Sequence, residues 1–236
     1  MNIAIIGYGK MGHEIEKIAK ARGITVASII DPTDKNANFT EINEESMRNA
    51  DVCIDFTKPD AVTDNVRNIS KFKKNIVVGT TGWHNSLDEI KTIVQQNNIG
   101  LIHASNFSIG VNIFFRIIGN AAKMMDNIKD YDVFGYELHH SKKLDSPSGT
   151  AKSIENILAG NIKRLKQVNF ASVRAGSIPG THVVGFDSSA DTIELKHTAR
   201  NREGFALGAL MAAEWIQNKK GFFDINDMMK EIIGGN

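Results

Sequence analysis

Short apolar runs alternate with amphipathic segments through the first hundred residues of the chain. The runs are continuous, which predicts strands buried on both faces, over residues 3–6, 24–30, 52–56, 76–78 and 100–104. Between them, apolar side chains recur at helical spacing over residues 14–22 and 87–96, and Lys58-Pro59-Asp60 opens a further helix. Strands that alternate with helices predict a parallel sheet with helices on both faces.

A different pattern begins after about residue 110. Helices are predicted over residues 111–125, 150–158 and 203–217, and strands over residues 132–138, 170–174, 181–186 and 191–197. The last three strands follow one another across turn-rich stretches, which indicates an antiparallel or mixed sheet. The sequence therefore predicts an α/β protein with an N-terminal Rossmann-type, doubly wound parallel sheet and an inserted α+β domain.

Composition narrows the class of protein and its partners. Hydrophobic residues make up 42% and charged residues 23% of the 236 residues, and the net charge is +1. These values are typical of a globular protein and give no reason to expect nucleic acid as a partner. The single cysteine, Cys53, excludes an internal disulfide. No run approaches the roughly 20 apolar residues that span a bilayer, and no basic leader precedes the first strand, so we expect a cytoplasmic protein without a membrane partner.

A glycine-rich turn joins the first predicted strand to the first helix. Gly7, Gly9 and Gly12 have the G-x-G-x-x-G spacing with which a tight turn and a helix N-terminus bind the pyrophosphate of a dinucleotide. Asp31 ends the second strand, where an acid accepts hydrogen bonds from the adenosine ribose. The glycines alone could serve only a tight turn, but the order of strand, loop, helix, strand and acid favours cofactor binding.

The acid at position 31 also bears on the choice of cofactor. A carboxylate favours a free 2′-hydroxyl over a 2′-phosphate, and the nearest compensating cation is Lys35. We therefore predict that NADH is used at least as well as NADPH. Residues 79–82 and 105–108 follow the fourth and fifth strands, where the nicotinamide half of the cofactor would lie, although each could be an ordinary loop with a helix cap.

The most informative segment is a cationic loop in the middle of the chain. His139, His140, Lys142 and Lys143 lie between the end of a strand and the start of a helix near Thr150. Backbone N–H groups at that helix start, with the four side chains around them, would bind a small polyanion, and a histidine or lysine could deliver a proton. The alternative is a solvated surface loop.

Other chemistry has less support in the sequence. No metal site is expected, because beyond Glu137 and Asp145 no third cysteine, histidine or acid near the loop has ligand spacing. His182 and His197 fall in the later strands and are interpreted as structural, and Cys53 is interpreted as a core residue.

Residues 137–150 read Glu-x-His-His-x-x-Lys-x-Asp-x-Pro-Ser-Gly-Thr. Together with the glycine turn, the Gly-Thr-Thr-Gly of residues 79–82 and the Ser-Asn-Phe-Ser of residues 105–108, this segment resembles the dihydrodipicolinate reductase family, and the resemblance spans nearly the whole chain. Two features depart from the usual pattern of the family: Ser146 stands where alanine is common, and the glycine turn is one residue shorter.

The resemblance implies that a cyclic dicarboxylate of lysine and diaminopimelate biosynthesis is reduced to tetrahydrodipicolinate, with NADH or NADPH, by a homotetramer. Together with the order of elements along the chain, it predicts a dinucleotide-binding domain of residues 1–106 plus 204–236 and a substrate-binding and oligomerisation domain of residues 107–203. His139 and Lys143 would be the catalytic pair, with Lys143 favoured as proton donor, and Arg202 would lie near the site. The implied cofactor-binding residues are Gly7, Tyr8, Gly9, Lys10, Met11, Gly12, Asp31, Gly79, Thr80, Thr81, Ala104, Ser105, Asn106 and Phe107, and the implied substrate-binding residues are His140, Gly149 and Thr150.

Two other functions are compatible with a nucleotide-binding fold. One is another two-domain NAD(P)-dependent dehydrogenase, such as one acting on a semialdehyde or an amino acid. A semialdehyde enzyme that forms a thioester would need a nucleophilic cysteine after a loop, and Cys53 inside a strand does not fit. A non-catalytic nucleotide sensor would have no use for the His-His-x-x-Lys loop. We therefore expect the cofactor to face this loop across a cleft between the two domains.

Overall fold

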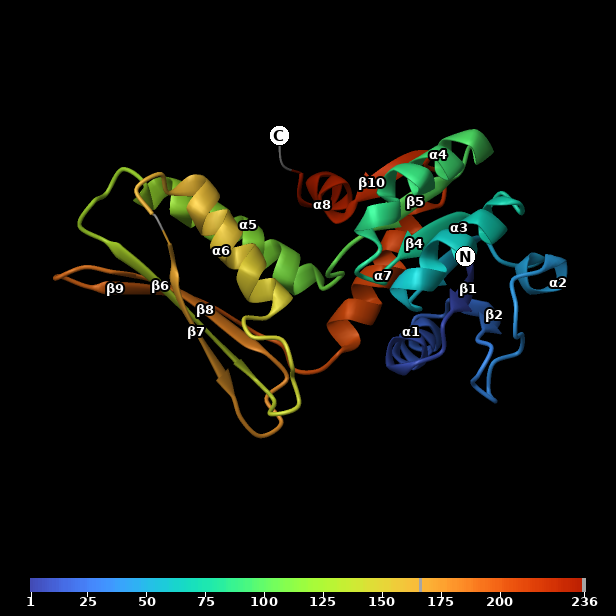
Figure 1. Cartoon of the computed structure of the whole chain (residues 1–236), viewed down its shortest axis with the longest axis horizontal. Coiled ribbons are helices and arrows are strands. Elements are labelled where there is room, and N and C mark those ends of the chain that lie inside the picture. The colour runs from blue at the N-terminus through green and yellow to red at the C-terminus, as the bar shows by residue number, and fades with distance from the viewer. Residues whose placement is uncertain (166, 235–236) are drawn as a thin grey trace. The chain divides into compact units, whose positions relative to one another are not determined.

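The chain divides into two units in a computed structural model, which describes residues 1–165 and 167–234 (Figure 1). One unit comprises Met1–Ser108 and Arg202–Asn236, and the other comprises Ile109–Asn201. Residues 166 and 235–236, which the predicted domains include, lie outside the described part of the chain. The chain thus leaves the first unit once and returns to it near its C-terminus.

A parallel sheet forms the centre of the first unit. Its six strands lie in the order β10-β5-β4-β3-β1-β2, and every neighbouring pair is parallel. Five of these strands match the apolar runs of the sequence, and their bounds are β1 Asn2–Ile6, β2 Thr25–Ile30, β3 Val52–Asp55, β4 Asn75–Val78 and β5 Gly100–His103. The sixth, β10 (Gly221–Asp224), was not predicted, because its four residues are only partly buried and include no continuous apolar run.

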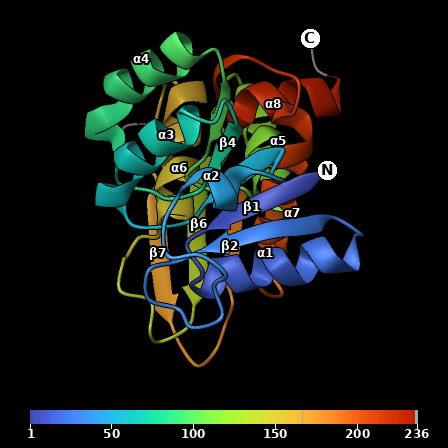
Figure 2. The same ribbon diagram turned by 90° about the vertical axis from the view of Figure 1, so that its right-hand side faces the viewer.

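Helices cover both faces of this sheet. Adjacent residues of a strand point to opposite faces, and Ile3, Ala4 and Ile5 of β1 are all fully buried. Helix α1 packs against α7, and α3 packs against α4 (Figure 2). The helices of this unit are α1 Lys10–Ala21, α2 Glu44–Met47, α3 Val62–Ser70, α4 Leu87–Asn97, α7 Glu203–Ile216 and α8 Ile225–Ile233.

Three details of the first unit differ from the prediction. Helix α1 begins at Lys10 rather than at residue 14, so that Gly12, the last glycine of the motif, lies inside its first turn. The short helix α2 and the final helix α8 were not predicted. Helix α8 follows β10 directly, and Asp224 caps its N-terminus by accepting hydrogen bonds from the backbone of Asn226 and Asp227.

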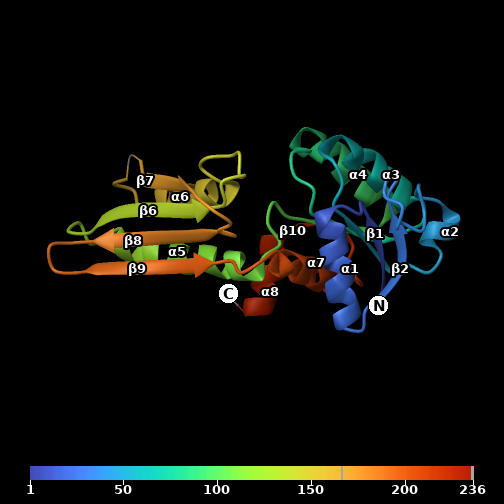
Figure 3. The same ribbon diagram turned by 90° about the horizontal axis from the view of Figure 1, so that it is seen from below.

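A mixed four-stranded sheet forms the second unit, in the order β7-β6-β8-β9. Strands β6 and β7 are parallel, and the other two pairs are antiparallel. Helices α5 (Ile109–Met125) and α6 (Gly149–Asn161) lie on one face of this sheet and form its core with Val133, Val184 and Phe186 (Figures 1 and 3). The strands are β6 Asp132–His139, β7 Asn169–Arg174, β8 Thr181–Asp187 and β9 Thr192–Thr198.

This architecture confirms the predicted fold class, an α/β protein with a Rossmann-type parallel sheet and a second, mixed-sheet unit. Among the residues that the structure describes, no helix has the length and the apolar composition needed to cross a membrane.

Candidate functional site

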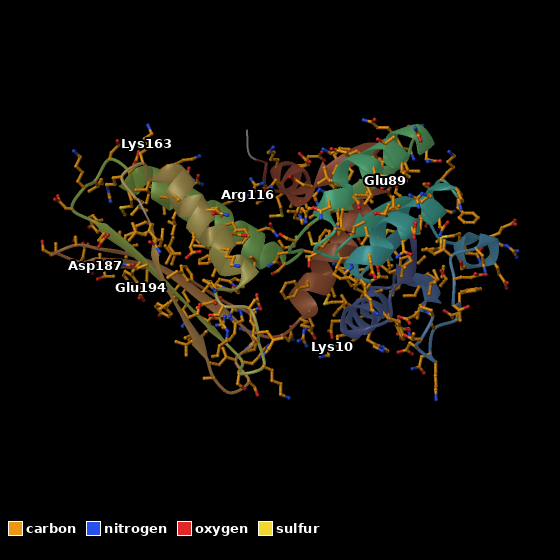
Figure 4. The ribbon with its side chains drawn as sticks, viewed as in Figure 1. Lys10, Glu89, Arg116, Lys163, Asp187 and Glu194 are labelled. Carbon is orange, nitrogen blue, oxygen red and sulfur yellow. The ribbon has the colours of Figure 1, made fainter. Side chains whose placement is uncertain are left out.

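The glycine turn ends in an open helix N-terminus. Gly7 has a φ of 87°, a conformation that side chains disfavour. A Cβ at Gly12 would lie 2.4 Å from the carbonyl oxygen of Gly7, so only glycine lets α1 pack this closely on the turn. A Cβ at Gly9, the N-cap, would meet no described atom within 4 Å, and the first turn of α1 carries no acid. Lys10, the first residue of α1, is exposed (Figure 4). These residues fit the pyrophosphate of a dinucleotide.

Asp31 is held against this turn. One of its carboxylate oxygens accepts the backbone N–H of Tyr8 at 2.8 Å, and the other accepts those of Thr33 and Asp34 at 2.8 and 3.1 Å. Burial alone would raise the pKa of Asp31, but these hydrogen bonds, with that of the Thr33 hydroxyl, lower it to about 2. The acid predicted to bind the adenosine ribose is therefore ionised and fixed beside the glycine turn.

A pocket of about 290 Å³ opens at the carboxyl ends of β3, β4 and β5. It brings together six of the predicted cofactor-binding residues with three further ones. Arg202, which the resemblance places near the site, lies on the wall of this pocket. It belongs to the first unit, whereas the predicted division placed it in the second domain. Phe56 and Phe205 were not predicted, although Phe56 follows β3 as Gly79 follows β4. The lining residues are Met11, Phe56, Gly79, Ala104, Ser105, Asn106, Phe107, Arg202 and Phe205.

Two neighbouring threonines in the loop after β4 have different surroundings. The Thr80 hydroxyl donates to the Asp55 carboxylate at 3.1 Å and accepts the backbone N–H of Thr57 at 2.8 Å. Asp55 is fully buried, and burial raises its pKa. The Thr81 side chain is exposed. The Thr80 side chain therefore stabilises the loop by bonding to the core. A contact between Thr80 and a cofactor would be made by its backbone.

Thr80→Val keeps the shape of the side chain but removes its hydroxyl. We expect a loss of about 1–3 kcal/mol in the free energy of unfolding, because buried polar groups of Asp55 and Thr57 lose a partner. Urea denaturation followed by circular dichroism measures this loss. The matched variant Thr81→Val, at an exposed position, should change stability by no more than about 0.5 kcal/mol. Equal losses in the two variants would contradict the bracing role of Thr80.

In the second unit, a buried carboxylate lies beneath the predicted catalytic histidine. Glu137 and His139 are two positions apart on β6 and point to the same face, with exposed fractions of 0% and 7%. One oxygen of Glu137, Oε1, accepts Ser148 N, Ser172 Oγ and Arg174 Nη2 at 2.9, 2.8 and 2.7 Å. Burial opposes ionisation of Glu137, but these donors lower its pKa to about 2. Glu137 is therefore a buried anion.

His182, interpreted from the sequence as structural, also lies beside Glu137 and His139. It pairs directly with Glu137 across the antiparallel strands β6 and β8, and its Nε2 lies 3.4 Å from Glu137 Oε2. The centroids of the His182 and His139 rings lie 5.1 Å apart. Spacing along the chain gave no sign of this contact, because the register of two strands is not visible in the sequence.

Glu137, His139 and His182 also form a candidate metal site. Single ligand atoms of Glu137, His139 and His182 lie within 4.8 Å of one another, so the structure supplies the third group that the sequence lacked. The carboxylate is already paired with Arg174 at 2.7 Å, and a cation beside the guanidinium would be repelled. We therefore keep the prediction that no metal binds here.

The cationic loop forms a corner that binds a carboxylate. Lys143 Nζ lies 2.8 Å from a carboxylate oxygen of Asp145, and the backbone of Gly149, at the start of α6, makes a smaller contribution to lowering the pKa of that carboxyl. The pKa of Asp145 is lowered, first by the hydrogen bond from Lys143. Ser148 caps α6 by accepting Ala151 N–H at 3.1 Å. A lysine and a helix start thus meet on one carboxylate in this part of the chain.

Two family models together match nearly the whole chain. The family model described as dihydrodipicolinate reductase, N-terminus, matches residues 1–107, and the one described as dihydrodipicolinate reductase, C-terminus, matches residues 110–229. The chain belongs to the dihydrodipicolinate reductase family. The motif of residues 137–150 and the glycine turn therefore lie in a protein of the family that they resemble.

Individual relatives match most or nearly all of the chain. The 4-hydroxy-tetrahydrodipicolinate reductase of Christiangramia forsetii is 38% identical, with 99% of each chain covered. That of Buchnera aphidicola subsp. Schizaphis graminum is 42% identical over 81% of this chain and 76% of its own length. Among solved structures, the dipicolinate-bound dihydrodipicolinate reductase from Paenisporosarcina sp. TG-14 superposes with a TM-score of 0.82 at 23% identity, over 97% of this chain and 99% of that chain. This last likeness concerns the fold.

Proposed function

We propose that this chain reduces 4-hydroxy-tetrahydrodipicolinate to tetrahydrodipicolinate with NADH or NADPH, in lysine and diaminopimelate biosynthesis. Family membership supports the reaction, since the relatives that span nearly the whole chain are reductases of this substrate. The observation that carries the assignment to particular residues is the corner at Lys143 and Gly149. It already binds the carboxylate of Asp145 and lies in the same segment as His139.

The first unit provides the groups that would hold the cofactor. The open N-terminus of α1 at Gly9 and Lys10 suits the pyrophosphate, and Asp31 suits the adenosine ribose. The pocket lined by Gly79 and Ala104 suits the nicotinamide side. When bound, the reduced nicotinamide supplies a hydride. The predicted cofactor-binding residues Tyr8, Met11, Thr81, Ser105, Asn106 and Phe107 belong to the same turn, pocket or loop.

The second unit provides the groups that would hold and protonate the substrate. His140, Gly149 and Thr150 bind its carboxylates in this proposal, as the corner now binds Asp145. Hydride addition to the ring leaves negative charge at a ring position, and Lys143 or His139 delivers a proton there. Burial lowers the pKa of His139, so Lys143 is the favoured proton donor near neutral pH.

A coupled assay tests the proposal. The preceding synthase generates fresh substrate, and the loss of nicotinamide absorbance is followed with NADH and with NADPH. We expect turnover that depends on both the synthase product and this chain. Absence of turnover with both cofactors, in a protein that is folded and binds NADH, would favour a nucleotide sensor and contradict the proposal.

The cofactor preference should respond to Asp31. Asp31→Asn keeps an oxygen to accept Tyr8 N–H but removes the charge that repels a 2′-phosphate. We expect wild type to use NADH at least as well as NADPH, and the variant to raise the NADPH-to-NADH ratio of kcat/KM by about 10-fold, which corresponds to about 1.4 kcal/mol. Lys35→Ala should lower the use of NADPH only. A strong preference of wild type for NADPH would contradict this role of Asp31.

We further propose a cytoplasmic homotetramer in which the second unit, residues 107–203 in the predicted division, forms the contacts between subunits. The proposal rests on the family resemblance. The part of the chain that the structure describes is consistent with it, since Val173 and Ile193 on the outer strands β7 and β9 are 46% and 41% exposed.

A further inference from the structure

The two oxygens of the buried Glu137 carboxylate have different partners. Oε1 accepts three hydrogen bonds, from Ser148 N, Ser172 Oγ and Arg174 Nη2. Oε2 accepts none that meets hydrogen-bond geometry within the described residues, and it is sealed from solvent. The carboxylate is therefore anchored through one oxygen, and the other is left for the imidazoles that face it.

Two imidazoles face Oε2. His139 Nδ1 lies 3.3 Å from it, and His182 Nε2 lies 3.4 Å from it. His139 Nδ1 is likewise buried without a hydrogen-bond partner among the described residues. An ionised carboxylate can only accept hydrogen bonds, and Glu137 stays ionised because its other oxygen is held by a guanidinium and two further donors. A hydrogen bond between His139 Nδ1 and Glu137 Oε2, now 3.3 Å apart, therefore requires Nδ1 to carry the hydrogen.

The other ring nitrogen of His139 points away from this carboxylate. A Cβ at Gly180 would lie 3.1 Å from His139 Nε2. Because residue 180 is a glycine, no side chain from that position lies against Nε2. A histidine whose Nδ1–H is fixed by a carboxylate presents Nε2 to its surroundings, which is the arrangement that an acid–base histidine needs.

The Glu137 carboxylate also reaches the substrate-binding end of the loop. Its Oε1 accepts the backbone N–H of Ser148, the N-cap of α6. The Ser148 hydroxyl lies 3.2 Å from His182 Nε2. Any movement of the carboxylate would thus displace both the ring of His139 and the helix start at Gly149 that binds a carboxylate.

We infer that Glu137 is a positioning residue, which fixes His139 as the Nδ1–H tautomer with Nε2 directed to the substrate and holds the start of α6 in register with it. His182 occupies the second side of the same oxygen and keeps the carboxylate from turning. The inference deepens the proposed reductase function and rests on it for the identity of the substrate. The tautomer itself is a property of the free protein.

The tautomer can therefore be measured without substrate, by ¹⁵N NMR of the full-length protein with labelled histidine, the His139 signals being assigned with a His139→Asn sample. In wild type near pH 7.5 we expect the hydrogen on Nδ1. Glu137→Gln places an amide where Oε2 was, and its N–H₂ would donate to Nδ1, so the hydrogen should move to Nε2. Wild-type His139 with its hydrogen on Nε2 would overturn the inference, and this result does not depend on how the Glu137→Gln variant folds.

Kinetics separate positioning from a structural role. Glu137→Gln should lower kcat by about 10-fold or more while leaving KM for NADH within about 3-fold, because the first unit is untouched. The matched variant Glu194→Gln makes the same change at an exposed position of β9 and should leave the His139 tautomer and kcat nearly unchanged. An unchanged tautomer in Glu137→Gln, with a loss of kcat no larger than that of Glu194→Gln, would show that Glu137 does not position His139. A wild type that has the expected tautomer but no reductase activity would refute the proposed function and leave the positioning of His139 established.

Discussion

Lys143→Ala is expected to lower kcat for dicarboxylate reduction by about 10²-fold or more, the usual loss when a general acid is removed. The Lys143 ammonium lies 2.8 Å from the Asp145 carboxylate, at the loop corner that also presents Gly149 N–H. A substrate carboxylate that takes this place would bring its ring within reach of the ammonium. Steady-state kinetics in the coupled assay, with both substrates saturating, measure the effect.

Two controls sharpen this prediction. Lys152→Ala removes an exposed lysine from α6, close to Lys143 in the sequence, and should leave kcat within about 3-fold of wild type. Lys143→Ala should also retain the wild-type affinity for NADH, since Lys143 belongs to the second unit. A kcat for Lys143→Ala equal to that of Lys152→Ala would remove Lys143 from the mechanism.

His139→Asn is the second variant with a large expected effect, a loss of about 10²-fold in kcat. The histidine lies over a buried anion, Glu137, which would stabilise its protonated form while a proton is transferred. Asparagine keeps a polar side chain of similar reach but cannot exchange a proton. Single-turnover measurements at saturating NADH should show that the chemical step, rather than cofactor binding, is slowed.

The neighbouring histidine provides the contrast. His140→Asn should raise KM for the dicarboxylate by about 10-fold and change kcat little, because His140 is proposed to bind a carboxylate rather than to transfer a proton. The double variant of His139 and Lys143 should lose about as much activity as the worse of the two single variants, since groups that act as a unit are not additive. Additive losses would indicate independent roles.

Much of the fold follows from local patterns. Continuous apolar runs identified five of the six strands in the parallel sheet, because a strand buried on both faces needs apolar residues at every position. This pattern did not predict β10, because the residues of Gly221–Asp224 are only partly buried. Helix α1 starts at Lys10, earlier than its amphipathic pattern suggested, because Gly12 interrupts the apolar periodicity without interrupting the helix, and Gly9 is its N-cap.

The candidate site could be predicted only where its residues are close in sequence. The segment of residues 137–150 contains His139, Lys143 and the start of α6, and its motif was recognisable. Contacts that depend on strand register were not, so His182 was interpreted as structural although it faces Glu137 across β6 and β8. The direction of a side chain was equally hidden: nothing in Gly-Thr-Thr-Gly shows that Thr80 binds Asp55 while Thr81 is exposed.

A crystal structure of this protein with NADH and pyridine-2,6-dicarboxylate, a stable analogue of the substrate, would test the central claim most directly. That claim is that a cofactor anchored at the glycine turn reacts with a dicarboxylate held by the loop of residues 139–150. We predict that a carboxylate of the analogue replaces Asp145 at Lys143 and Gly149, with His139 Nε2 and the nicotinamide both facing the pyridine ring. An analogue bound elsewhere, with His139 and Lys143 far from the nicotinamide, would contradict the account.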